Sequence, residues 1–258
     1  MNILVFDIET VPDLDGGRRL HGLDGLSDED VAKALFHLRA QETGGSEFLR
    51  LHLHRVVAIS AVRRHGEHLE VAALGEPDSS ERDLIRAFFD LIERDTPTLV
   101  SWNGGGFDLP VLHYRALLHG VSAPRYWDTG EEDREFRWNN YLSRYHSRHT
   151  DLMDVLAGYQ PRANAPLGEI ASLLGLPGKL GMDGAQVWER FLDADIRGIR
   201  DYCETDVLNT YLVWLRFELM RGQLLLPEYE GEITRLREFL KAEERPHFDS
   251  FLAAWPVD

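Results

Sequence analysis

Two acidic residues near the start of the chain, Asp7 and Glu9, are separated by a single isoleucine. They follow the apolar run Ile3–Phe6, which is typical of a buried strand. Because side chains alternate between the two faces of a strand, both carboxylates are expected on one face, with their Cα atoms roughly 6.5–7 Å apart. At that spacing they can bind one divalent cation. An isolated pair of this kind is more often an acidic strand end at the surface, so a catalytic role depends on the residues that follow.

A second motif, Asn103–Asp108, contains three consecutive glycines. It lies between an expected strand, Thr98–Ser101, and an expected helix from about residue 109 to 119. Glycine permits tight turns and lets a ligand approach the backbone closely. The segment is not a phosphate-binding P-loop, because no Gly-Lys-Ser/Thr follows it. Asp108 is expected near the N-terminus of the helix, where the helix dipole favours a carboxylate, so capping is the alternative to a role in catalysis.

A third motif lies inside the long helix that we expect from about Asp195 to Arg221. Tyr202 and Asp206 are four residues apart, so they share one face of the helix at a distance of roughly 6 Å. An aspartate on the apolar side of a helix needs a partner, and a cation shared with the two acids of the first strand would supply one. The neighbouring acids Asp201 and Glu204 fall on other faces and are expected to be solvated.

The elements that must position these motifs alternate between strands and helices, without an internal repeat or a linker. This pattern favours a single α/β domain over residues 1–258. Residues 11–54 are interpreted as an insertion between two strands, with one or two short helices that could form a lid or a substrate wall. Residues 222–258 are expected to form a C-terminal helical extension that adds one more helix, at about residues 233–244.

The loop-rich segment 121–150 combines aromatic residues with arginines. Such a mixture can stack on bases and bind phosphates. In the alternative interpretation the rings pack together and the arginines pair with nearby acids, and the mixed charge favours this for most of them. The acids in question are Glu131, Glu132, Asp133 and Glu135.

Composition limits the possible functions. The formal net charge of −16 argues against a protein that holds nucleic acid through a broad basic surface. It does not exclude an enzyme that meets phosphate through bound metal ions and a few local cations. The single cysteine, Cys203, rules out an intrachain disulfide and is expected to be a small packing residue. We find no secretory signal and no stretch long enough to span a membrane, so a cytoplasmic protein is expected.

Together, the three motifs resemble a known family. Phe-Asp-Ile-Glu-Thr, Asn-Gly-x-x-Phe-Asp and Tyr-x-x-x-Asp, in this order, are similar to the motifs of the DEDD 3′–5′ exonucleases of the RNase H-like superfamily. The tyrosine at position 202 places the chain with the DEDDy branch. Within it, the chain is most similar to free-standing bacterial proteins related to the proofreading exonuclease domain of family-B DNA polymerases. The resemblance covers about Asn2–Trp214 and implies an RNase H-like α/β fold, a mixed sheet of about five strands flanked by helices.

The resemblance also implies roles for individual residues. Tyr202 would orient the attacking water. Hard oxygen ligands suit Mg²⁺ or Mn²⁺, and two such ions can activate a water and stabilise the leaving 3′ oxygen. The implied metal-binding acids are Asp7, Glu9, Asp108 and Asp206.

Four further residues are candidates for binding the substrate. Thr10, Asn103 and Phe107 match motif positions that line the terminal-nucleotide pocket in the family. Phe107 can equally be a buried anchor of its turn. Lys179 lies in a glycine-bearing loop, where it could contact a phosphate or be merely exposed.

The expected function is therefore a two-metal 3′–5′ exonuclease that releases nucleoside monophosphates from the ends of single-stranded DNA or RNA. One alternative is a non-catalytic nucleic-acid-binding or assembly module on the same fold. That alternative predicts the loss of one or more of the acids, and all four are present. The other alternative is a two-metal hydrolase of small nucleotides.

Overall fold

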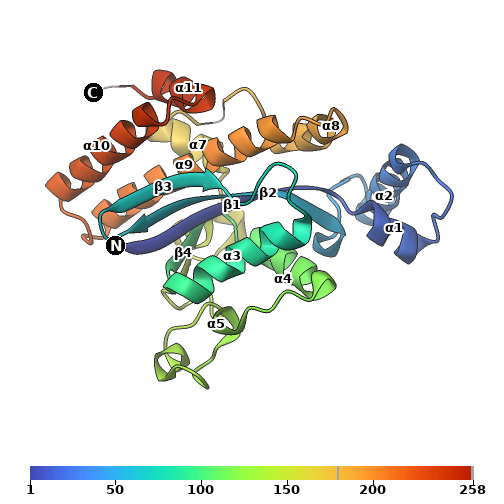
Figure 1. Ribbon diagram of the computed structural model, residues 1–258, viewed down its shortest axis with the longest axis horizontal. Coiled ribbons are helices and arrows are strands. Elements are labelled where there is room, and N and C mark those ends of the chain that lie inside the picture. The colour runs from blue at the N-terminus through green and yellow to red at the C-terminus, as the bar shows by residue number, and fades with distance from the viewer. Residues whose placement is uncertain (179, 257–258) are drawn as a thin grey trace.

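The fold is described from a computed structural model, which covers residues 1–178 and 180–256. Its centre is a five-stranded sheet in the order β3-β2-β1-β4-β5 (Figure 1). The first three strands pair antiparallel, whereas β4 and β5 continue the sheet in parallel with β1. The mixed sheet expected from the resemblance is confirmed, and with helices on both faces it is an RNase H-like α/β fold. The strands are β1 (Asn2–Pro12), β2 (His54–His65), β3 (His68–Ala73), β4 (Thr98–Ser101) and β5 (His149–Asp151).

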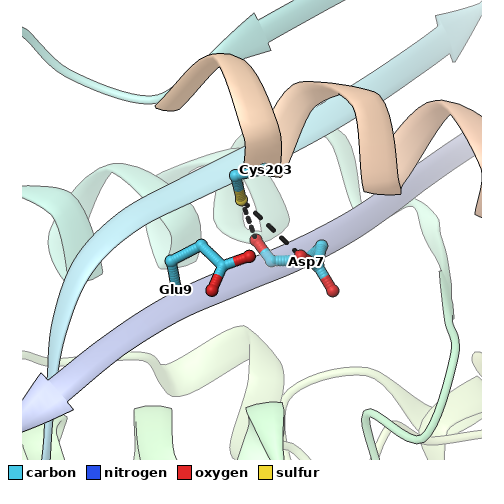
Figure 2. A group of neighbouring side chains, drawn as sticks. All are labelled: Asp7, Glu9 and Cys203. Atoms are coloured by element: carbon cyan, nitrogen blue, oxygen red, sulfur yellow. Dashed lines mark hydrogen bonds between the residues drawn. The ribbon is translucent and has the colours of Figure 1, made fainter. Parts of the chain in front are cut away.

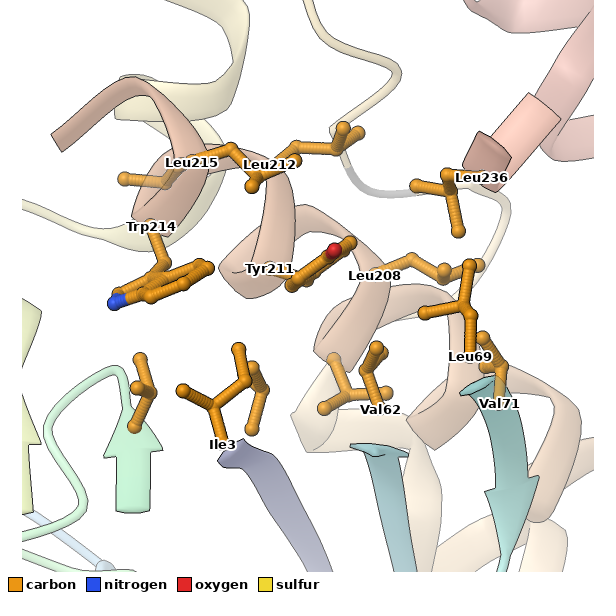
Figure 3. Packing of buried hydrophobic residues seen from close by; sticks show 14 of the residues in the cluster. Ile3, Val62, Leu69, Val71, Leu208, Tyr211, Leu212, Trp214, Leu215 and Leu236 are labelled. Carbon is orange, nitrogen blue, oxygen red and sulfur yellow. The ribbon is translucent and has the colours of Figure 1, made fainter. Parts of the chain in front are cut away.

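Helices cover the two faces of the sheet because side chains alternate along its central strand. Ile3 and Val5 of β1 belong to a cluster with α9 (Ile196–Met220), which crosses one face (Figure 3). The even-numbered residues of the same strand, Leu4, Phe6 and Ile8, pack on the opposite face. That face is covered by α3 (Glu81–Asp95) and α4 (Asp108–His119).

The segment between β1 and β2 contains two α-helices, in agreement with the one or two expected, and the second is longer than expected. β1 continues to Pro12, and α1 (Leu14–His21), α2 (Asp28–Thr43) and a 3-10 turn η1 (Leu51–Leu53) follow it. The two helices project at one end of the molecule (Figure 1). They have a small core of their own, which consists of Val31, Leu35, Leu49 and Leu53.

The segment 121–150 mostly follows the packing interpretation. Phe136 is fully buried, and the guanidinium carbon of Arg148 lies 4.4 Å from the centre of its ring. Arg125 pairs with Asp133 at 3.3 Å. Trp138, by contrast, is 83% exposed. The elements of this part are α5 (Pro124–Trp127) and η2 (Arg134–Arg137).

The C-terminal segment is helical as expected, and α10 covers most of the predicted helix at 233–244, but the segment contains a second helix that was not predicted. Pro246 is the first residue of the second helix, where its missing amide hydrogen is not needed. A proline also disfavours helical geometry at the residue before it, which separates the two helices. They are α10 (Leu226–Ala242) and α11 (Pro246–Ala254).

Short helices connect β5 to α9. They are α6 (Leu152–Leu156), η3 (Pro161–Ala163), α7 (Leu167–Leu173), η4 (Gly184–Gln186) and α8 (Val187–Leu192). Across the described residues, none of the helices combines the length and the apolar character needed to cross a bilayer.

Candidate active site

The candidate site is built on the face of β1 that is turned toward α9. One carboxylate oxygen of Asp7, one of Glu9 and the sulfur of Cys203 all lie within 4.8 Å of one another (Figure 2). The thiol of Cys203 donates to the backbone oxygen of Asp7 at 3.5 Å and to its carboxylate at 3.6 Å. The expected placement of both acids on one side of the strand is therefore observed. The pairing register of β1 with β2 shifts immediately after Glu9, and such a bulge re-aims the side chains next to it.

Asp108 reaches the same strand from the N-terminus of α4. Its carboxylate accepts a hydrogen bond of 3.1 Å from the amide of Ile8, which lies between the two acids of β1. This amide can be contacted from the side because β4 pairs with β1 only as far as Val5. Burial raises the pKa of the Asp108 carboxyl to about 7, and the charge of Asp151 adds to the effect.

A glycine turn places Asp108 in this position. The carboxylate of Asp151, at the end of β5, accepts hydrogen bonds of 2.9 Å from the amides of both Asn103 and Gly105. Asn103 has a positive φ of 63°. A Cβ atom at Gly104 would lie 2.2 Å from the hydroxyl oxygen of Ser101, so only glycine fits there. Asp151 thus holds the turn, and it also caps α6 by accepting from the amide of Asp154 at 3.3 Å.

Tyr202 and Asp206 complete the group from α9. The Tyr202 hydroxyl is hydrogen-bonded to the Asp206 carboxylate. Burial raises the pKa of Tyr202, and the negative charges of Asp206 and Glu9 raise it further. The phenol is therefore protonated at neutral pH.

The electrostatics of Asp7 show that the four acids converge. Burial raises the pKa of the Asp7 carboxyl well above its ordinary value, and the charges of the other three acids raise it further. Carboxylates from β1, α4 and α9 therefore act on one another although they are far apart in the sequence.

This donor set fits a hard divalent cation. A cation would offset both the burial of Asp7 and the repulsion among the carboxylates. The thiol of Cys203 is the only soft group among the three residues of the Asp7 cluster. Burial and then the charge of Asp7 raise its pKa, so it remains a protonated donor and leaves the ligand set to oxygen atoms. Oxygen ligands suit Mg²⁺ or Mn²⁺ better than zinc.

Two of the candidate substrate residues contact His54, a third contacts Asp151, and the fourth is not described. The Thr10 hydroxyl is 2.9 Å from Nδ1 of His54, and the half-buried ring of Phe107 packs on the same histidine at 5.1 Å. The amide of Asn103 is bonded to Asp151, as described above. Lys179 lies outside the described residues.

Two residues that contact Phe107 are not predicted from the sequence. Phe48 and His54 come from the segment between β1 and β2, and their rings contact Phe107. No local pattern marks them, because their importance comes from a contact with a distant part of the chain.

The expectation that Glu204 is solvated is wrong. Glu204 is 1% exposed and accepts hydrogen bonds from the amide of Ala73, from Arg245 and from His247. The C-terminal helices cover α9 on the side of Glu204. This polar side of α9 is therefore buried against the C-terminal segment and is not exposed to solvent. Asp201, which is 44% exposed at its side chain, lies at the rim of the same group.

Comparisons with known proteins agree with this geometry. A family model described as "Predicted 3'-5' exonuclease related to the exonuclease domain of PolB" matches residues 46–255. The match includes Asp108, Tyr202 and Asp206, and the two acids of β1 precede it. Among curated proteins, DNA polymerase 1 of Sulfurisphaera ohwakuensis is 52% identical over 42 residues. These residues are 16% of this chain and 5% of the polymerase, so the chain matches a small part of that relative.

Proposed function

This chain belongs to the predicted 3′–5′ exonucleases related to the exonuclease domain of PolB, and from that membership we propose a specific activity. The protein is a two-metal, DEDDy-type exonuclease that hydrolyses the terminal phosphodiester bond at the 3′ end of single-stranded DNA or RNA. Each cycle releases one nucleoside monophosphate. The observation that carries the proposal is the geometry of the acids on β1: Asp7 and Glu9 each place a carboxylate oxygen in one cluster, and Asp108 accepts a hydrogen bond from the amide between them. The charges of Asp108 and Asp206 act on the buried Asp7 carboxyl and help to raise its pKa.

We assign the metal ligands to the four converging acids, Asp7, Glu9, Asp108 and Asp206. When bound, Mg²⁺ or Mn²⁺ ions would lower the pKa of the attacking water and stabilise charge on the leaving 3′ oxygen. The protein's own contribution is to hold the ligands in place. Ile8 fixes Asp108 through its amide, and the Cys203 thiol fixes Asp7.

Tyr202 orients the attacking water in this proposal. Its hydroxyl hydrogen is used in the hydrogen bond to Asp206, which leaves the lone pairs of the phenol oxygen to accept a hydrogen from water. Because its pKa is raised, Tyr202 does not act as the base. Its role is to position the water.

The charge of the protein predicts how substrate binds. At a net charge of −16, phosphates are repelled unless cations bridge them to the site. Binding of an oligonucleotide should therefore require a divalent metal. Tight binding in EDTA would instead favour the non-catalytic binding module, and hydrolysis confined to mononucleotides and dinucleotides would favour the small-nucleotide hydrolase.

The test uses single-stranded DNA and RNA oligonucleotides labelled at either end and incubated with Mg²⁺, Mn²⁺ or EDTA. We expect 5′-labelled substrates to shorten stepwise and 3′-labelled ones to release a labelled mononucleotide first, in metal only. Asp206→Asn should abolish cleavage. Asp201→Asn, on the same helix but outside the site, is the matched control and should cleave normally. Full activity of Asp206→Asn, or cleavage in EDTA, would overturn the proposal.

A further inference from the structure

We propose that Phe48 is a base-stacking residue that binds the nucleobase of the 3′-terminal nucleotide, together with Phe107. This inference rests on the proposed exonuclease function and names a part of its substrate site. It also gives a function to the segment that joins α2 to β2.

Three rings meet at this place. The centre of the Phe48 ring lies 5.7 Å from that of Phe107, with an angle of 51° between the planes. It lies 5.2 Å from the centre of the His54 ring, and His54 meets Phe107 edge-on at 5.1 Å. The Phe48 and Phe107 rings therefore pack against each other, and both contact His54.

The cluster is joined to the proposed metal ligands by the chain at two points. Phe107 immediately precedes Asp108, whose carboxylate is bonded to β1. His54 contacts the hydroxyl of Thr10, the residue that follows Glu9. We therefore place the base of the terminal nucleotide at these rings when its phosphate lies at the acids.

Phe48 is exposed in a way that the fold does not require. Its side chain is 58% exposed, whereas the next residue, Leu49, is 3% exposed and packs in the small core with Leu35. The backbone oxygen of Phe48 accepts a hydrogen bond of 2.8 Å from Arg39. An apolar ring is thus presented to solvent on an anchored backbone, so binding a base would order little additional chain.

Stacking suits this site because the surroundings are acidic. A neutral ring attracts a base without adding charge, and it accepts any of the bases because each has a π-face. Stacking of one base contributes roughly 1–3 kcal/mol, which corresponds to an affinity change of roughly 5- to 150-fold. This is a useful share of substrate affinity in a protein whose net charge of −16 repels phosphates.

The experiment compares two oligonucleotides, one ending in a normal 3′ nucleotide and one ending in an abasic residue. For the normal end, Phe48→Ala should raise KM at least 5-fold. For the abasic end its KM should equal that of the unmodified protein, and Phe48→Trp should behave as the unmodified protein on both. Trp138→Ala removes an exposed ring from the 121–150 segment and should change neither KM.

A second measurement separates this inference from the proposed function. An oligonucleotide with 2-aminopurine at its 3′ end should lose fluorescence on binding in Ca²⁺, and Phe48→Ala should abolish that quenching. If the unmodified protein degrades oligonucleotides but Phe48→Ala has an unchanged KM and unchanged quenching, the stacking role is wrong while the exonuclease stands. If the protein neither cleaves nor binds oligonucleotides, both proposals are wrong.

Discussion

The amide of Ile8 donates a hydrogen bond of 3.1 Å to the carboxylate of Asp108, which lies 100 positions later in the chain. Ile8 is flanked by Asp7 and Glu9, so this contact sets the position of α4 relative to both acids of β1. The donor belongs to the backbone, and a change of side chain at position 8 does not remove it. The contact therefore fixes the position of the Asp108 carboxylate relative to those of Asp7 and Glu9, whether or not an ion is bound.

The raised pKa of Asp108 predicts a pH-dependent stability. A carboxyl whose pKa is about 7 in the folded state and about 4 when unfolded binds a proton mainly in the folded state between these values. Its contribution to stability is complete at low pH and is lost as pH rises through about 7. In EDTA, the unmodified protein should therefore lose stability from pH 5 to 7, whereas Asp108→Asn lacks this loss because asparagine does not titrate. The unfolding free energy of the variant minus that of the unmodified protein should rise by about 1.4 kcal/mol per pH unit over this range.

Denaturant titrations at several pH values give this difference, and taking it removes contributions from groups that do not interact with Asp108. These include His113 and His149, for which burial lowers the pKa to about 4. An exposed carboxylate on α3 serves as a control, because Asp90→Asn should show no such trend. A flat difference for Asp108→Asn would show that this carboxyl is not protonated in the folded protein.

The turn before α4 predicts opposite effects for two glycines. Gly104→Ala would bring a Cβ within 2.2 Å of the Ser101 hydroxyl, so the turn must shift and Asp108 with it. We expect a loss of roughly 1–3 kcal/mol in stability and a large loss of nuclease activity. Gly231 lies inside α10 with no atom within 4 Å of an added Cβ, so Gly231→Ala should instead stabilise by roughly 0.5–1 kcal/mol.

Thermal unfolding and the oligonucleotide assay check both variants. If Gly104→Ala were as stable and as active as the unmodified protein, the turn would not control the position of Asp108.

Most of the site could be predicted from sequence because its residues occur in local patterns. The alternation of β1 places Asp7 and Glu9 on one face, and the four-residue spacing on α9 pairs Tyr202 with Asp206. These spacings follow from backbone geometry alone.

The remaining features depend on contacts between distant segments. Glu204 looked solvent-exposed because polarity alone does not reveal that α11 covers that side of α9. Phe48 has no signal of its own, because its place beside Phe107 depends on the path of the chain after α2. The second C-terminal helix is not predicted either, because its 9 residues are too few to show a clear helical period, although Pro246 marks its start.

The contact of Glu204 with the C-terminal segment predicts a stability effect. Burial opposes the charge of Glu204, but hydrogen bonds from His247 and Arg245 hold the pKa of its carboxyl below the usual value. Glu204→Gln leaves Arg245 with Asp201, at 3.8 Å, as its charged partner. Because Arg245 is 32% exposed, the loss of stability should be smaller than the roughly 3–5 kcal/mol expected for a fully buried ion pair. Hydrogen exchange should become faster in α11 first.

The control for this variant is Glu238→Gln, an exposed position on α10 that should change neither stability nor exchange. If hydrogen exchange in α11 is the same in Glu204→Gln as in the unmodified protein, the packing of Phe248 and Phe251 alone holds this helix in place.

Removal of charge at Asp7 separates the metal-binding role of the site from its role in folding. Because burial and three neighbouring carboxylates raise the pKa of Asp7, Asp7→Asn should relieve repulsion and raise the unfolding temperature in EDTA. Mn²⁺ at a hundred times its dissociation constant should stabilise the unmodified protein by about 2.7 kcal/mol, a shift of roughly 5–10 °C. Asp7→Asn should lose most of that shift, whereas Asp90→Asn should keep it. An equal Mn²⁺ shift in Asp7→Asn would place the cation elsewhere, because the shift depends on the affinity of the folded protein for the ion and the loss of a carboxylate ligand lowers that affinity.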